Sequence, residues 1–156
     1  MFFGQYKYNL DEKGRIVIPS EFRKELGSTV ICNKGIENCI TIYKESDFNK
    51  LVNEISELPF NKSDTRKFNR YFFASVFKKE IDSQGRINID LILIQHADIL
   101  KECVIVGVGN AIEIWAKKSW DEIEKARIDE YISSDYIKSG DVINDFYEIY
   151  LPIKKF

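Results

Sequence analysis

The chain has 156 residues, of which 44% are hydrophobic and 31% charged, and its formal net charge is −2. This length and apolar content fit one compact folded unit and exclude both a disordered chain and two independent domains of average size. No apolar stretch approaches the roughly 20 residues of a membrane span, and the N-terminus lacks the layout of a secretory signal, so we expect a cytoplasmic protein without a membrane partner.

The first element with a chemical signature is residues 11–15 (Asp-Glu-Lys-Gly-Arg), which we name loop 1. Asp11 can accept hydrogen bonds from backbone N–H groups two residues on, and Gly14 permits a positive φ where the chain reverses. Arg15 would then stand on a stiff base, from which a guanidinium can bind phosphate or the edge of guanine. The spacing leaves an alternative open, in which Asp11 and Arg15 form only a structural salt bridge.

An alternating strand is expected after loop 1, followed by a short helix that Pro19 begins and that buries Phe22 and Leu26. Two apolar strands then meet at a turn at Lys34-Gly35. A longer amphipathic helix follows, which Ser46 or Asp47 can cap and which Pro59 ends.

A further helix is predicted over residues 64–76, because apolar residues recur there at helical spacing. Its basic residues Arg66, Lys67 and Arg70 form either a solvated face or a contact with DNA, and the pattern leaves both open.

The rest of the chain repeats the first part. Residues 82–86 (Asp-Ser-Gln-Gly-Arg), which we name loop 2, follow loop 1 at a distance of 71 residues, with Gln84 in place of Lys13. The strand after each loop and both later strands also recur, as residues 11–18 and 82–89, 30–32 and 104–106, and 40–43 and 112–115. Three ordered blocks at a nearly constant offset predict two diverged copies of one half-unit.

In the second copy, Asp90 can cap a short element over residues 91–94, for which helix or strand remains open. The last helix is expected to begin near Ser119. Residues 113–148 carry 10 acidic and 5 basic residues, whereas the rest carries 15 acidic and 18 basic, which leaves room for one positive face.

The cysteines Cys32, Cys39 and Cys103 lie in apolar runs, without a C-x-x-C pair and with His96 as the only histidine. They are interpreted as reduced core thiols, and we expect neither a metal site nor a cofactor.

The predicted fold class is α+β, with a β-rich core of two pseudo-equivalent half-units and flanking helices. Each half has too few strands to bury a sheet face alone, so the two should interleave. The expected parts are residues 1–60 (first repeat with its C-terminal helix), 61–76 (connecting helix), 77–130 (second repeat with its C-terminal helix) and 131–156 (an acidic, flexible tail).

Several motifs together resemble the MraZ family. They are Phe2, Gly4 and Tyr6 at the N-terminus, the doubled D-x-x-G-R of the two loops, and residues 104–115 (VIVGVGNAIEIW), and the resemblance spans about residues 2–125. It implies that the half-units are swapped-hairpin, AbrB-like modules, and that copies assemble into a homo-oligomeric ring, usually an octamer. It also implies a nucleoid-associated regulator that binds short repeats in double-stranded promoter DNA of the bacterial division and cell-wall gene cluster.

The resemblance places DNA contacts at Lys13, Arg15 and Arg86. The complete set of expected site residues is Lys13, Arg15, Gln84 and Arg86 for DNA binding, and Asp11, Gly14, Asp82 and Gly85 for shaping the turns. The first copy keeps Arg23 and Lys24 in its short helix, whereas the second has only apolar residues there. We therefore expect the first half to be the main DNA-reading half, and the second to pack and assemble.

Two other function classes fit the sequence less well. An AbrB-like module can also serve protein interaction, as in antitoxins, and this is the alternative to DNA binding. An enzyme is not expected, because the chain lacks a nucleophile and base signature and a glycine-rich phosphate loop, so no small-molecule substrate is expected either.

Overall fold

The computed structural model describes residues 1–125, which belong to two compact units, Met1–Lys117 and Lys118–Phe156. The first unit is described completely and combines strands with helices, so the α+β class is confirmed. Its strands are β1 (Gln5–Asn9), β2 (Arg15–Val17), β3 (Thr29–Lys34), β4 (Ile40–Lys44), β5 (Phe77–Glu80), β6 (Arg86–Asn88), β7 (Glu102–Gly107) and β8 (Ile112–Ala116). Its helices are α1 (Ser20–Leu26), α2 (Glu45–Ser56), α3 (Ser63–Phe73) and α4 (Leu91–His96).

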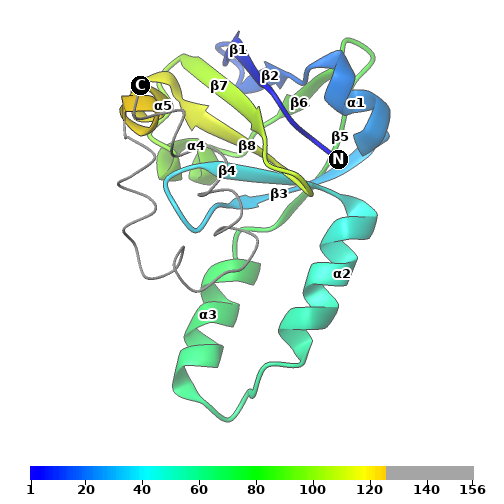
Figure 1. Cartoon of the computed structure of the whole chain (residues 1–156), viewed down its shortest axis with the longest axis vertical. Helices are drawn as coiled ribbons and strands as arrows, with labels where there is room; N and C mark the ends of the chain where they lie inside the picture. The colour runs from blue at the N-terminus through cyan, green and yellow to red at the C-terminus, as the bar shows by residue number, and fades with distance from the viewer. Residues whose placement is uncertain (126–156) are drawn as a thin grey trace, which may run out of the picture. The chain divides into compact units, whose positions relative to one another are not determined.

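The two repeats exchange strands. Six strands form an antiparallel sheet in the order β1-β7-β8-β4-β3-β5, and β2 and β6 form a separate two-stranded ribbon (Figure 1). The first strand of each repeat pairs with the third strand of the other, because β1 lies against β7 and β5 against β3. The ribbon and the β4–β8 pair also join one repeat to the other. The halves therefore interleave, as the repeat predicted.

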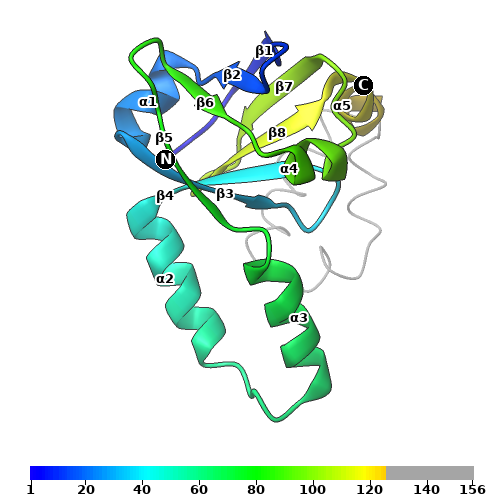
Figure 2. The same cartoon turned by 180° about the vertical axis from the view of Figure 1, so that it is seen from behind.

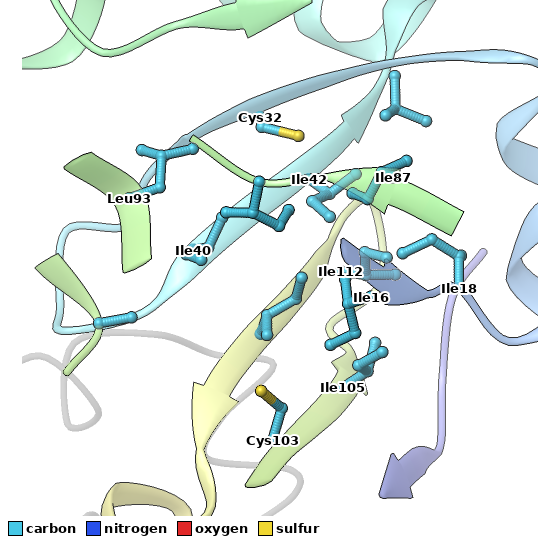
Figure 3. Close-up of a cluster of buried hydrophobic side chains, with 14 of the residues drawn as sticks. Ile16, Ile18, Cys32, Ile40, Ile42, Ile87, Leu93, Cys103, Ile105 and Ile112 are labelled. Carbon is cyan, nitrogen blue, oxygen red and sulfur yellow. The ribbon is translucent and has the colours of Figure 1, made fainter. Parts of the chain in front are cut away.

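The main core lies between the ribbon, α1, α4 and one face of the sheet (Figure 3). Ile16 and Ile87 face each other in the ribbon and are each 1% exposed. All three cysteines are buried and free, which confirms that they are reduced core thiols. Burial raises the pKa of the Cys32 thiol to about 12 and that of Cys103 to about 11, so both stay protonated near neutral pH.

A second, smaller core lies on the opposite face of β3 and β4. Side chains alternate along a strand, so Ile31 of β3 faces this core while Cys32 faces the main one. Ile31 packs there with Phe48 and Ile55 of α2 and Phe72 of α3. Helices α2 and α3 extend away from the sheet as a pair, at the end of the unit opposite the ribbon (Figure 1).

Two predicted helix caps are wrong. Helix α2 begins at Glu45 with no side-chain cap, so neither Ser46 nor Asp47 is its cap. Asp90 does precede α4, but it makes no capping bond and instead forms an ion pair with Lys79. Helix α2 is stabilised by burial of Phe48 and Ile55 and α4 by burial of Leu93, in both cases without a side-chain cap.

The short element of the second repeat is a helix, α4, which settles the open alternative. Of its apolar residues only Leu93 is fully buried, and Ile94 is half-buried. Leu91 is 66% exposed and Ile92 43% exposed, so packing within the first unit leaves these two side chains uncovered.

In the second unit, α5 (Lys117–Lys125) begins in the last residue of the first unit, two residues before the predicted Ser119. The end of the predicted second repeat and the 131–156 tail lie outside the described residues. None of the helices within residues 1–125 combines the length and apolarity that a membrane crossing requires.

Candidate nucleic-acid interface

Loop 1 is closed by its own aspartate. Asp11 Oδ1 accepts hydrogen bonds from the backbone N–H groups of Lys13 at 2.9 Å and Arg15 at 2.8 Å. Asp11 Oδ2 accepts a bond from Arg15 Nε at 2.7 Å. Gly14 has φ +78°, which a residue with a side chain adopts only under strain. One carboxylate thus fixes both the turn and the arginine above it.

Loop 2 has the same geometry. Asp82 Oδ1 accepts from the N–H groups of Gln84 and Arg86, each at 2.9 Å, and Asp82 Oδ2 accepts from Arg86 Nε at 2.9 Å. Gly85 also has φ +78°. Two loops of different composition therefore share one hydrogen-bond pattern, which the predicted turn residues impose.

These bonds keep both carboxylates ionised. The backbone N–H of Arg15 contributes most to lowering the pKa of Asp11, and the Arg15 guanidinium and the Lys13 N–H add to it. The pKa of Asp82 is lowered in the same way, first by the N–H of Arg86. Each loop therefore holds a carboxylate and a guanidinium that are both charged near neutral pH.

Both arginines lie on one face of the ribbon. In the antiparallel register Arg15 pairs with Asn88, and Val17 with Arg86. Opposite residues share a face, so these four point away from the core while the central isoleucines point into it. Arg15 and Arg86 stand at diagonal positions, where Cβ atoms are about 7–8 Å apart or less. Figure 2 shows β2 and β6 side by side at one end of the unit.

The salt bridge that was the alternative for Asp11 and Arg15 is present, and its counterpart joins Asp82 and Arg86. Both pairs are formed through Nε. A guanidinium has two more nitrogens with four N–H donors, so an arginine held by Nε can still bind an oxygen at its outer edge. The side chains of Arg15 and Arg86 are 29% and 24% exposed. The bridge thus orients the arginines without enclosing them.

The loops are also tied to each other. Ile18 N–H donates to Gly85 O at 2.8 Å, and Ile89 N–H donates to Gly14 O at 2.8 Å. Each loop therefore rests on the strand end of the other repeat, and the two loops and the ribbon form one continuous structure.

The sequence placed Arg23 with the DNA-reading residues of the first half, and the structure places it against loop 2. Arg23 Nη1 donates to Ile18 O at 2.6 Å, and a Cβ on Gly85 would lie only 2.1 Å from Arg23 Nη1. Arg23 of the first repeat therefore lies beside the loop of the second, because strand exchange brings α1 next to loop 2. The sequence does offer one indication of the difference between the loops. The offset of 71 residues aligns Arg23 with Ile94, which lies against loop 1.

The basic residues of α3 lie far from the loops. Helix α3 packs on the second core, at the end of the unit away from the ribbon in both views (Figures 1 and 2). Arg66 Nη1 donates to Phe60 O at 3.1 Å, within the α2–α3 connection. This face cannot join the two loops on one short stretch of DNA. Residues 1–125 also contain no group of three or more side chains suited to hold a metal ion.

Comparison with known proteins gives a consistent result. The family "MraZ protein, putative antitoxin-like" matches residues 1–71 and again 72–135. Proteins named "Transcriptional regulator MraZ" from Lactobacillus gasseri and Lactobacillus johnsonii are 41% and 42% identical to this chain over 131 residues. The Lactobacillus helveticus protein of the same name is 41% identical. Each alignment covers 84% of this chain and 92% of the relative.

Proposed function

This chain belongs to the MraZ family, and we propose that it is a transcriptional regulator that binds double-stranded DNA through loops 1 and 2. The family is one of regulators and not of enzymes, in agreement with the sequence analysis. One observation carries the proposal: Arg15 and Arg86 project from the same face of the two-stranded ribbon.

A two-stranded ribbon is narrow enough to enter the major groove of B-form DNA. Two arginines oriented by aspartates lose little side-chain entropy when they bind phosphate or the O6 and N7 of guanine. Lys13 and Gln84 are exposed at the same position of each loop, where lysine can bind phosphate and glutamine can also bind adenine. Asp11, Gly14, Asp82 and Gly85 shape the loops and are not proposed to contact DNA.

We infer that the half-units are swapped-hairpin modules of the AbrB-like kind. The reciprocal pairing of β1 with β7 and β5 with β3 supports this inference. We further propose that the chain consists of four parts, which are residues 1–60, 61–76, 77–130 and 131–156.

We propose short promoter repeats of the bacterial division and cell-wall gene cluster as the target, and association with the nucleoid. Repeated DNA suits a homo-oligomeric ring, such as an octamer, because many weak loops on one face add by multivalency. The exposed Leu91 and Ile92 of α4 support assembly, since adjacent apolar side chains on a surface favour contact with another protein.

Equilibrium binding to the DNA upstream of the chain's own gene tests the proposal. An Arg15→Ala, Arg86→Ala double variant should bind this DNA with an affinity at least about 100-fold lower, since two charge-assisted contacts are removed in each subunit. Its assembly state and melting temperature should match those of the unaltered protein. Unchanged binding by a correctly assembled double variant would overturn the proposal.

The antitoxin-like family description favours a second candidate, a protein-interaction module. Its surface would be the apolar side of α4, not the arginine face of the ribbon. Absence of DNA binding even at low salt, where phosphate contacts are strongest, would favour this candidate.

A further inference from the structure

Arg23 links the two repeats at the edge of the ribbon. Its Nη1 donates to the carbonyl of Ile18, whose own N–H donates to Gly85 O of loop 2. A Cβ added to Gly85 would lie 2.1 Å from Nη1 and 2.6 Å from Cζ of Arg23. The guanidinium therefore lies directly on the backbone of loop 2, and Gly85 is buried beneath it.

The equivalent position beside loop 1 carries no charge. The offset of 71 residues aligns Arg23 with Ile94, and Ile94 Cδ1 would lie 3.7 Å from a Cβ on Gly14. Gly14 is half-buried, whereas Gly85 is buried. The two loops thus share their backbone and differ in their neighbour, which is a cation at loop 2 and an aliphatic side chain at loop 1.

This difference in neighbours gives the two loop sites different net charges. Loop 1 is neutral overall, because Lys13 and Arg15 are balanced by Asp11 and Glu12. In loop 2, Arg86 is balanced by Asp82, and Gln84 adds nothing. The neighbouring Arg23 then gives the loop 2 site a net charge of +1, and a phosphate binds more tightly where positive charge is in excess.

We propose that Arg23, a residue of the first repeat, contacts a DNA phosphate at loop 2 and makes this composite site the more strongly anion-binding of the two. The inference rests on the proposed function and assigns a further residue to the same interface. The bond to Ile18 O uses one of five guanidinium donors, and the side chain is half-exposed. Because that bond holds the group in place, little side-chain entropy is lost when it binds phosphate.

Binding of the full-length protein to the upstream DNA, measured over a range of salt concentrations, tests this assignment. Arg23→Gln should weaken binding about tenfold and reduce the slope of log affinity against log salt by about 0.9 for each contacting subunit. Arg23→Lys should keep most of the slope, because it keeps the charge. The reverse variant Ile94→Arg places a cation beside loop 1 and should increase the slope by a similar amount.

The outcomes separate this inference from the proposed function. If the Arg15→Ala, Arg86→Ala double variant binds normally, the proposed function fails. If that variant loses binding while a folded Arg23→Gln protein keeps both affinity and slope, only the role of Arg23 fails. Should Arg23→Gln not assemble, Ile94→Arg decides the question, because an unchanged slope overturns the assignment and an increased slope supports it.

Discussion

Loop 1 and loop 2 have one hydrogen-bond pattern and different neighbours. In both, an aspartate accepts two backbone N–H bonds and one arginine Nε bond, with distances of 2.7–2.9 Å. Beside loop 2 lies Arg23, and beside loop 1 lies Ile94. Duplication has thus kept the residues that shape each loop, whereas the residues around it have diverged. When strand exchange places a residue of one repeat beside the loop of the other, the DNA affinity of a loop cannot be judged from the residues of its own repeat alone.

The largest expected effect concerns the buried core of the ribbon. It tests whether the two repeats contribute equally to stability. Ile16→Ala and Ile87→Ala each empty half of the buried central pair of the ribbon and should each destabilise the protein by about 2–5 kcal/mol. Urea unfolding of both variants measures this. A difference of more than about 2 kcal/mol between them would show that the pseudo-equivalence does not extend to the core.

A smaller effect is expected for the loop glycines. Gly14→Ala and Gly85→Ala should each lose about 1–2 kcal/mol of stability, since both residues have φ +78°. Gly85→Ala should in addition displace Arg23 and weaken DNA binding, whereas Gly14→Ala should affect binding less. Thermal unfolding and binding at one salt concentration measure the two effects. Equal losses of affinity would remove the proposed distinction between the loops.

Exchanging the charge at the variable loop position sharpens the comparison. Lys13→Gln gives loop 1 the residue of loop 2, and should reduce the salt slope by about 0.9 for each contacting subunit. Gln84→Lys should increase it by the same amount. If neither variant alters the slope, these exposed side chains do not contact phosphate. Both positions are exposed, so stability should change by less than about 0.5 kcal/mol and can serve as the internal control.

The smallest effect is expected from acidification. Asp11 and Asp82 have lowered pKa values in the folded protein, so their contribution to stability is complete above the ordinary value of 3.8. It is lost as the pH falls from there through the lowered folded values. NMR titration of the two arginine Nε–H signals should show both loops changing together below about pH 4. Asp11→Asn should abolish the transition in loop 1 only, and a transition near neutral pH would contradict the assignment.

Local features of the fold follow from the sequence because their causes are local. The aspartate, glycine and arginine of each loop specify a tight turn within five residues, and the structure has both turns. The repeat itself indicates equivalent strands, and β2 and β6 lie where it places them. The helical pattern of residues 64–76 likewise corresponds to α3, which ends at Phe73.

The repeat predicts that the halves interleave, but the same patterns do not show which strands pair across them. An apolar strand such as β3 buries its side chains equally well against a strand of its own repeat or of the other. Its sequence therefore does not determine which strand it pairs with. The position of Arg23 depends on that choice, so its place beside loop 2 does not follow from the sequence of its own repeat. The start of α2 was also missed, because packing of Phe48 and Ile55 stabilises the helix without a capping side chain.

Strand exchange also determines when the protein can first become active during synthesis. The ribbon needs Val17 and its partner Arg86, which the ribosome adds 69 residues later. At about 5–20 residues per second, this interval lasts roughly 3–14 seconds. During that time the first repeat can form its own hairpin of β3 and β4, but it lacks β5 and β8, the strands that pair with this hairpin. A newly made chain therefore cannot present its arginine face to DNA until β6 of the second repeat has left the ribosome.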